Sequence, residues 1–307
     1  MSLDQSNPNR VVLRTTESIL ACFKAHPRAL RELRATREAA KALQEVAGWM
    51  GGQGLPAVVA GTKEVRELAG TDAVAAAITA RPVLGQAKPS DFAEWRDEGA
   101  VTVVADGFED PADLATVVRS MAAFGLRRLL LAGESERLAF DPVLWQEARG
   151  ALESVRLIRA PALGGLLSLI EPTSVVLGFD PRMGRSLAES APVRAPGRGN
   201  VLLLSAKGLG PAMQPKAEHL FRRPGQAGEH PLSAGDAAAL IFHWNASAPK
   251  PRSKDKGFFA RKRAKEKGSG EWGITGIRRR RKMTRRRRMR RMRRNWLPGL
   301  QAPPLAP

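Results

Sequence analysis

Short apolar runs alternate with helix-forming segments between residues 101 and 244, and this alternation limits the possible folds more than any other feature. Five runs rich in Val and Leu are predicted as strands, namely Val101–Ala105, Arg128–Ala132, Val155–Arg159, Ser174–Gly178 and Val201–Ser205. Helices are predicted over Pro111–Phe124, Pro142–Leu152, Leu163–Ile170 and Ala234–Trp244. Strands that alternate with helices in this way form a mostly parallel sheet covered on both faces. The sequence therefore predicts an α/β fold for residues 100–245.

The first part of the chain predicts a smaller α/β domain over residues 13–81. The apolar spacing between Thr16 and Ala47 predicts two helices, which are separated at Pro27 because proline interrupts a helix. A strand over Leu55–Ala60, a helix over Lys63–Leu68 and a strand or buried segment over Ala73–Ile78 follow. Residues 82–99 contain Pro82 and Pro89 and are predicted to be a linker.

The positive charge of the chain is concentrated near its C-terminal end. The 307 residues include 50 Lys and Arg and 30 Asp and Glu, for a net charge of +20. Residues 250–294 hold 22 of the bases and three of the acids, which leaves 28 bases and 27 acids elsewhere. Beyond Asn245, Pro, Ser, Lys and Arg dominate without apolar periodicity, so residues 246–307 are predicted to be a disordered basic tail.

Arginine runs in this tail are predicted to bind a polyanion, because neutralising phosphates releases their counterions. The two longest runs, which are assigned to RNA binding, are Arg278, Arg279, Arg280, Arg281 and Arg285, Arg286, Arg287, Arg288, and the pairs Arg290-Arg291 and Arg293-Arg294 follow. Trp272 and Trp296 provide rings on which unpaired bases can stack. The alternatives are a solvated charge run or a low-complexity extension. A membrane surface fits less well, because the apolar residues form only a thin stripe.

Several other classes of protein are disfavoured. The single cysteine, Cys22, lies among apolar residues and is expected to be buried, with no disulfide or thiolate metal site. No metal-ligand spacing links His26, His219, His230 and His243, so we predict no metal. No run approaches the length of about 18 apolar residues typical of a membrane span. We therefore expect a soluble, cytoplasmic protein.

A motif around the first helix of the larger domain gives the first sign of a family. The strand Val103–Asp106 precedes Asp110-Pro111-Ala112-Asp113, then Arg119, and the helix ends at Phe124-Gly125. This order resembles the first motif of the SpoU-type (TrmH-like) RNA ribose 2′-O-methyltransferases, which have an α/β trefoil-knot (SPOUT) fold. In that family Asn stands at the position of Asp113.

Two later segments extend the resemblance at the expected intervals. The second motif, a strand leading to Gly-x-Glu-x-x-Gly, aligns with Leu204 to Gly210, where Ser205 replaces Gly and Lys207 replaces Glu. The third region, Ile-Pro and then Ser-Leu-Asn-Val, aligns with Arg223-Pro224 and Pro231 to Ala234. The resemblance thus implies a cofactor site formed by Leu204, Ser205, Lys207, Gly208, Gly210, Arg223, Pro224, Leu232 and Ser233.

The resemblance implies methyl transfer from S-adenosylmethionine to a ribose 2′-hydroxyl of tRNA or rRNA. Arg119 would engage the target phosphate and help to deprotonate the hydroxyl, and Asp113 would share the catalytic site. Residues 13–81 resemble the small ribosomal-protein-like domain that binds RNA in this family. A homodimer through the knotted domain is also implied.

The sequence leaves alternative interpretations open. Arg119 can be read as a solvated surface arginine, Asp113 as a first-turn acid that complements the helix dipole, and Lys207–Gly210 as an ordinary glycine turn. Three polar positions depart from the family pattern: Asp113, Lys207 and Ser233. The alternative function is therefore a catalytically weakened or inactive RNA-binding protein associated with the ribosome.

Overall fold

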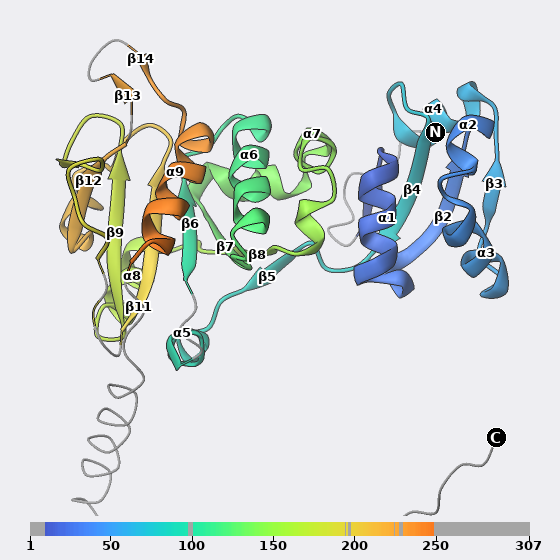
Figure 1. The fold of residues 1–307 in the computed structure, drawn as a ribbon. Coiled ribbons are helices and arrows are strands. Elements are labelled where there is room, and N and C mark those ends of the chain that lie inside the picture. Colours follow the sequence, from blue (N-terminus) through green and yellow to red (C-terminus); the bar gives the residue numbers. More distant parts are fainter. Residues whose placement is uncertain are drawn as a thin grey trace, which may run out of the picture. The chain divides into compact units, whose positions relative to one another are not determined.

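The larger α/β domain contains one sheet of eight strands (Figure 1) in the order β10-β12-β9-β11-β6-β7-β8-β5, and every pairing in it is parallel. This computed structural model describes residues 10–97, 101–193, 195, 198–223, 225–226 and 230–248. The predicted tail, apart from residues 246–248, lies outside the described residues, as do all eight arginines assigned to RNA binding. The parallel sheet confirms the α/β fold class.

The elements of this domain follow the predicted alternation closely. The strands are β5 (Leu84–Gln86), β6 (Thr102–Asp106), β7 (Arg128–Ala132), β8 (Arg156–Arg159), β9 (Ser174–Asp180), β10 (Arg185–Ser186), β11 (Gly199–Ser205) and β12 (His219–Arg222). The α-helices are α5 (Pro89–Asp97), α6 (Pro111–Ala123), α7 (Pro142–Glu147), α8 (Leu163–Ile170) and α9 (Ala234–Ala246). A short hairpin, β13 (Gly225–Gln226) with β14 (His230–Pro231), precedes α9.

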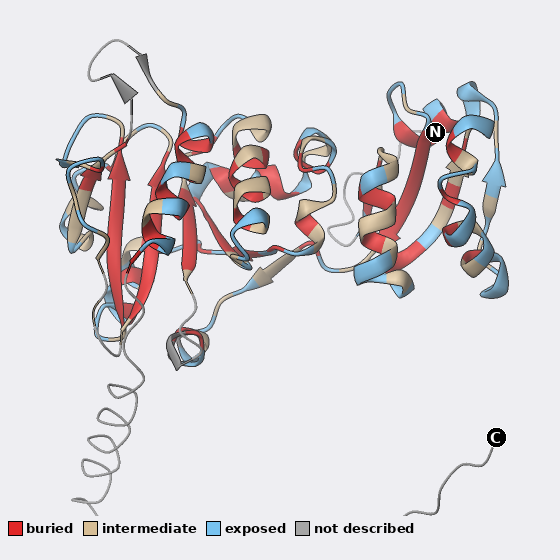
Figure 2. Cartoon of the chain, in the orientation of Figure 1, coloured by how far each residue is buried: buried red, intermediate tan, exposed pale blue. Residues whose placement is uncertain are grey.

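Both faces of the sheet are buried, as Figure 2 shows for its central strands. Along β11, Leu202 and Leu204 belong to one apolar cluster, whereas Val201 and Leu203 belong to the other. Successive side chains of a strand point to opposite faces, so a strand buried on both faces has an unbroken apolar sequence. This explains why the runs are continuous rather than alternating.

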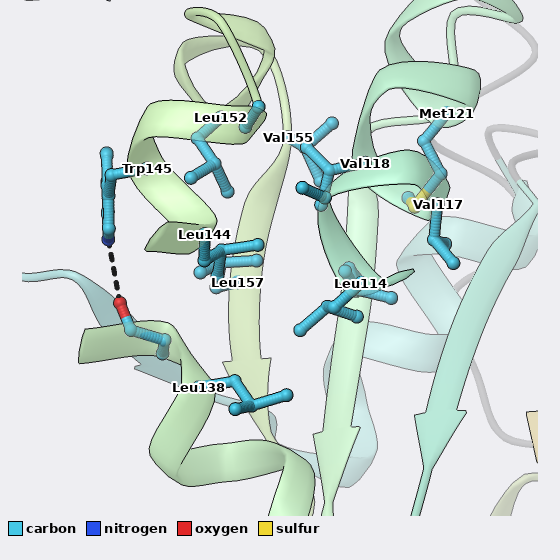
Figure 3. Packing of buried hydrophobic residues seen from close by; sticks show 14 of the residues in the cluster. Leu114, Val117, Val118, Met121, Leu138, Leu144, Trp145, Leu152, Val155 and Leu157 are labelled. Carbon is cyan, nitrogen blue, oxygen red and sulfur yellow. Dashed lines mark hydrogen bonds between the residues drawn. The ribbon is translucent and has the colours of Figure 1, made fainter. Parts of the chain in front are cut away.

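Helices α6, α7 and α9 supply the cluster on one face, and α5 and α8 supply the other. In Figure 3, Leu114 and Val118 of α6 point toward Leu144 of α7 and Leu157 of β8, and all four belong to the same core. The indole Nε1 of Trp145 donates to the carbonyl oxygen of Ala139 over 2.8 Å. Trp145 can therefore be buried without leaving its polar group unpaired.

The N-terminal domain has a four-stranded sheet in the order β1-β4-β2-β3. Its elements are β1 (Arg10–Leu13), α1 (Thr16–Ala25), β2 (Leu30–Ala35), α2 (Arg37–Ala40), α3 (Gln44–Gly52), β3 (Ala57–Val59), α4 (Thr62–Ala69) and β4 (Ala75–Ala80). Cys22 is fully buried, as expected, and burial is the main cause that raises its pKa to about 12.

Two predictions about the first hundred residues need correction. Residues 30–35 form β2 rather than part of a helix, because pairing with β3 and β4 buries Leu30 and Leu33 in the core. The predicted linker, residues 82–99, contains β5 and α5. Strand β5 pairs with β8 at the edge of the large sheet, and Phe92 and Trp95 of α5 are buried against it. The prolines favoured a linker, but the apolar side chains of Phe92 and Trp95 are buried in the core of the larger domain.

The order of the strands determines how the chain returns to the first helix. After β9, the chain places β11 between β9 and β6, and then β12 on the opposite side of β9. It next crosses back, so that α9 packs against α6, which directly follows β6. This return brings the segments after β11 and β12 to the helix that starts beyond β6.

Gly178, in the middle of β9, lets the loop that follows β11 pack onto the sheet. A Cβ atom at this position would lie 2.8 Å from Leu209 Cδ1 and 2.9 Å from Ala217 Cβ. We expect Gly178→Ala to lower the free energy of unfolding by about 1–3 kcal/mol, the usual effect of overpacking. Urea unfolding followed by circular dichroism measures the change.

Gly165→Ala in α8 is the matched control, because a Cβ atom there has no neighbour within 4 Å. This substitution should leave the free energy of unfolding unchanged or raise it by up to about 1 kcal/mol, because alanine favours the helix. Equal effects of the two substitutions would contradict the packing role of Gly178.

Candidate functional site

Three neighbouring parallel strands end in polar residues at the same edge of the sheet. Strand β6 ends at Asp106, β9 at Asp180 and β11 at Ser205. In the register of the sheet, Ser205 is paired with Asp106 and Arg222 of β12 with Asp180. Burial raises the pKa of Asp106. In open α/β sheets, ligands bind beyond the carboxyl ends of the strands, so this edge is the candidate site.

The carboxylate of Asp180 fixes two loops of the site. Its Oδ1 atom accepts hydrogen bonds from the backbone N–H groups of Arg182 and Met183, over 2.8 and 2.9 Å. Its Oδ2 atom accepts one from the backbone N–H of Leu209 over 2.7 Å. Asp180 is 1% exposed, so these bonds compensate for the burial of its charge.

The segment from Leu204 to Gly210 contains five of the predicted cofactor residues, including the end of β11. Leu204 and Ser205 are buried as the last residues of the strand. Gly208 adopts φ +106°, and a Cβ atom there would lie 3.1 Å from Asp180 Oδ2. Glycine is required at this point because the backbone is left-handed and passes close to the carboxylate. Gly210 has open space around it.

Arg223, which directly follows β12, extends a buried guanidinium group into the same edge. Its Nη2 atom donates to the carbonyl oxygen of Ala206 over 3.2 Å. Its Nε and Nη1 atoms are buried and have no hydrogen-bond partner in the described part of the chain. Burial lowers the pKa of Arg223, while the charges of Asp113 and Asp180 oppose this effect.

Asp113, in the first turn of α6, is bonded to the start of α9. Its Oδ1 atom accepts hydrogen bonds from the hydroxyl of Ser233 and from the backbone N–H of Gly235, the latter over 2.9 Å. Ser233 is also the N-cap of α9 and accepts from the backbone N–H of Asp236. The aspartate therefore fastens the third region of the site to α6.

Lys207 forms an exposed ion pair with Glu109, which lies in the loop between β6 and α6. The hydrogen bond from Lys207 is the main cause that lowers the pKa of Glu109. The lysine that replaces an acid of the family pattern is thus paired with an acid, and the pair connects the loop after β11 to the loop after β6.

Arg119 lies six residues beyond Asp113 on α6, about 9 Å along the helix at 1.5 Å per residue. Its guanidinium group donates to the carbonyl oxygen of Glu147 and to Thr116 Oγ1, the latter over 3.0 Å. The side chain is therefore held against α6 and the end of α7, and no described contact joins it to the loops around Ser205, Arg223 and Ser233.

The structure thus brings most of the predicted site residues to one edge. Leu232 is partly buried beside the core, at the start of the turn into α9. Pro224 lies outside the described residues. Sequence reasoning missed Asp180 and Glu109. The segment Phe179-Asp180-Pro181 repeats the pattern of an apolar strand that ends in aspartate, as at Asp106, and this signal points to Asp180.

The described part of the chain offers neither a cluster of metal ligands nor a helix able to span a membrane. Within it, no group of three or more His, Cys, Asp or Glu side chains is placed to hold a metal ion. No helix in the described ranges combines the length and apolar character needed to cross a membrane.

The fold is similar to that of several solved methyltransferases. The SpoU methyltransferase AviRb from Streptomyces viridochromogenes, in complex with AdoMet, aligns with a TM-score of 0.62 and 20% identity, over 80% of this chain and 94% of that chain. An RNA 2′-O ribose methyltransferase aligns with a TM-score of 0.61 and 19% identity, over 79% and 90%. An rRNA methyltransferase from Sinorhizobium meliloti aligns with 0.61 and 16%, over 78% and 88%.

No protein-family model matches the sequence, and neither does any curated protein. The structural similarity establishes the fold, so the chain has the α/β-knot fold of the SpoU-type RNA methyltransferases. In this fold, three neighbouring central strands end at the edge that holds Asp106, Asp180 and Ser205.

We expect Asp180→Asn to destabilise the protein. The substitution places an amide N–H group opposite a backbone N–H group, either the buried one of Leu209 or the partly buried ones of Arg182 and Met183. Leaving a buried donor without an acceptor costs about 1–3 kcal/mol. Chemical denaturation measures this loss, and Glu189→Gln, which removes the charge of an exposed acid, should change the stability far less.

The ion pair between Lys207 and Glu109 predicts a pH dependence. Because the pKa of Glu109 is lowered in the folded protein, the pair contributes stability above the ordinary glutamate pKa of 4.5 and loses it as the pH falls through the folded pKa. Carbon-detected NMR titration should show Lys207→Gln returning this pKa toward its ordinary value. Lys216→Gln, which removes a lysine bonded to Ser168, should leave it in place.

Proposed function

We propose that the protein is an RNA methyltransferase of the SpoU type, which transfers a methyl group from S-adenosylmethionine to a ribose 2′-hydroxyl of tRNA or rRNA. The observation that carries this proposal is the convergence of three chain segments at one edge of the knotted sheet. The loop after β11, Arg223 after β12 and Ser233 before α9 meet the start of α6 there. Proteins with this fold include one solved with AdoMet and one described as an RNA 2′-O ribose methyltransferase.

The residues at this edge fit the proposed cofactor. Arg223 has two buried nitrogen atoms, Nε and Nη1, that donate to no group among the described residues, and Asp180 and Asp113 supply negative charge close by. S-adenosylmethionine carries a sulfonium cation, an ammonium group and a carboxylate, so it requires charges of both signs. Gly208 leaves the backbone of its loop unobstructed by a side chain at the closest approach to Asp180. We propose that the loop residues contact the nucleoside through their backbone groups.

Bound S-adenosylmethionine would supply an activated methyl group, whose carbon–sulfur bond breaks as the bond to the ribose oxygen forms. The chain must then hold the ribose in line with that methyl group and accept the hydroxyl proton. We propose that Arg119 binds the adjacent phosphate, for which its planar fork is suited, and helps to withdraw the proton. Arg119 has to exchange its bonds to Glu147 and Thr116 for this contact.

We propose that Asp113 acts mainly as a positioning residue. Its carboxylate is already engaged by Ser233 and Gly235, so it keeps α9 and the third region of the site against α6. An asparagine side-chain oxygen accepts hydrogen bonds from the same two donors, which explains how Asp can stand where the family has Asn.

RNA binding is proposed to involve the N-terminal domain and the arginine-rich segment from Arg278 to Arg288. The balance of charge in that segment favours a polyanion, and phosphate contacts give affinity rather than sequence preference. We also propose a homodimer. Leu240 of α9 is 48% exposed and Phe124, just after α6, is 38% exposed, so these adjoining helices present apolar surface.

The rival function is an RNA-binding protein without methyltransferase activity. The contacts of Asp113, Lys207 and Arg119 favour it, because each of these side chains is already bonded within the chain. The two functions differ in one property that is simple to measure, the affinity for S-adenosylmethionine.

The test measures cofactor binding by calorimetry and methylation with tritiated S-adenosylmethionine on unmodified tRNA and rRNA transcripts. We expect binding below millimolar concentration and the formation of 2′-O-methylnucleotides, recognised by their resistance to alkaline hydrolysis. Arg119→Ala should lower the methylation rate by about 100-fold or more, the range for a residue that assists proton transfer. Its affinity for the cofactor should remain within about 2-fold, because no described contact joins Arg119 to the cofactor loops.

Arg156→Ala serves as the matched control, because Arg156 is exposed and begins β8, at the edge of the sheet opposite to the candidate site. Arg156→Ala should leave both the methylation rate and the affinity for the cofactor unchanged. If wild-type protein binds no S-adenosylmethionine at millimolar concentration yet still binds RNA, the enzyme proposal fails and the rival function stands.

A further inference from the structure

Arg223 has hydrogen-bonding capacity that the described chain does not use. The residue is 6% exposed, and only Nη2 has a partner, the carbonyl oxygen of Ala206 at 3.2 Å. The Nε and Nη1 atoms are fully covered and unpaired within the described residues. A buried guanidinium group normally forms several hydrogen bonds, since leaving a charged group unsatisfied costs more than leaving a neutral one.

The two acids whose charges act on Arg223 already accept hydrogen bonds from other groups. Asp180 accepts from three backbone N–H groups, and Asp113 accepts from Ser233 and Gly235. Both raise the pKa of Arg223 through their charge, yet neither forms an ion pair with it. Their charge therefore stabilises the cation without using its N–H groups.

Arg198 shows what a structural arginine looks like in the same sheet. Its Nη2 atom donates to the carbonyl oxygens of Glu171 and Ser174, over 2.8 and 2.5 Å, and pairs with Glu218 at 2.7 Å. These contacts tie together the amino ends of the strands, away from the candidate site. Within the described residues, Arg198 leaves one buried nitrogen, Nε, without a partner, whereas Arg223 leaves two, Nε and Nη1, and forms a single bond of 3.2 Å at the carboxyl ends where the site lies.

We propose that Arg223 is an oxyanion-binding residue of the site, and that the oxyanion is the carboxylate of the amino-acid part of S-adenosylmethionine or a phosphate of the RNA. This inference rests on the proposed function and assigns a specific contact to it. Nη2 has two N–H bonds, one on the edge shared with Nε and one on the edge shared with Nη1, and Ala206 accepts one of them. Two oxygens of one anion can therefore bind along the other edge. The family pattern has Ile at this position, so the contact is particular to this chain.

The depth of Arg223 favours the carboxylate. A residue that is 6% exposed is within reach of the end of a small ligand inserted in the site, whereas the phosphates of a polymer remain near the surface. The N–H groups are covered, so an oxyanion reaches them only when the guanidinium group or a covering side chain shifts. The single bond of 3.2 Å to Ala206 allows such a shift at low cost.

The experiment compares S-adenosylmethionine with 5′-methylthioadenosine, which has the same nucleoside and lacks the amino-acid part. Calorimetry on the full chain gives both dissociation constants for wild type, Arg223→Met, Arg223→Lys and Arg198→Met. We expect Arg223→Met to weaken S-adenosylmethionine binding by about 10- to 100-fold, as for the loss of charged hydrogen bonds, and to leave 5′-methylthioadenosine within about 2-fold. Arg223→Lys should give an intermediate loss, and Arg198→Met should leave both constants unchanged.

RNA binding, measured by fluorescence anisotropy over a range of salt concentrations, separates the two sources of the oxyanion. If Arg223 binds a phosphate, Arg223→Met leaves S-adenosylmethionine binding intact, weakens RNA binding and reduces the salt slope by about 1. If Arg223→Met weakens the binding of S-adenosylmethionine and of 5′-methylthioadenosine equally, the proposal is overturned. Unchanged binding of every ligand would overturn it as well. If neither nucleoside binds wild type, the proposed function fails instead.

A measurement on wild type avoids dependence on variants that may fold poorly. The Nε–H resonance of Arg223 is identified in a nitrogen–proton correlation spectrum as the one that Arg223→Lys lacks. It should move downfield when S-adenosylhomocysteine, which keeps the carboxylate, is added, and stay in place with 5′-methylthioadenosine. For a phosphate, the same shift should appear only with RNA. No shift with either ligand would overturn the proposal.

Discussion

The parallel pairing of β6, β11 and β9 is the constraint on which the site depends. Because parallel strands end at the same edge, Asp106, Ser205 and Asp180 are adjacent even though up to 99 residues separate them in the chain. The apolar clusters on both faces bury these strands and hold them in the interior of the domain. Asp180 then fixes the loops to the ends of the strands, because its carboxylate accepts hydrogen bonds both from the segment after β9 and from the loop after β11.

Much of this architecture could be predicted from the sequence. Strand β7 and helix α8 have the predicted bounds, because an apolar run buried on both faces and a helix with apolar residues at every turn give unambiguous patterns. Strand β2 could not be predicted in this way. Its apolar residues Leu30 and Leu33 are three apart, which also fits a helix, and only pairing with β3 and β4 decides the conformation. Likewise, Pro82 and Pro89 favour a linker, whereas β5 pairs with the edge of the large sheet and α5 packs against that sheet.

The candidate site was predictable in its location but not in its contacts. Motif spacing placed the loop after β11 in one predicted site with Arg223 and Ser233, and in the structure Arg223 donates to Ala206 of that loop while Ser233 donates to Asp113. It could not show that Lys207 pairs with Glu109, or that Asp113 binds the start of α9. These two contacts join residues that are separated by 98 and 122 positions in the sequence, and only the folded sheet brings them together.

The departures from the family pattern are therefore partly compensated by their neighbours. A lysine in place of an acid would leave an unbalanced charge, but Glu109 faces Lys207 across the two loops. An aspartate in place of asparagine adds a negative charge, and the N-terminus of α9, whose dipole is positive there, receives it through Gly235. Arg223 is the exception within the described residues, because its Nε and Nη1 atoms are buried without a hydrogen-bond partner there. Asp113 and Asp180 stabilise its charge but accept none of its hydrogen bonds, and in our proposal an anionic group of a ligand accepts them, which connects the fold to the proposed function.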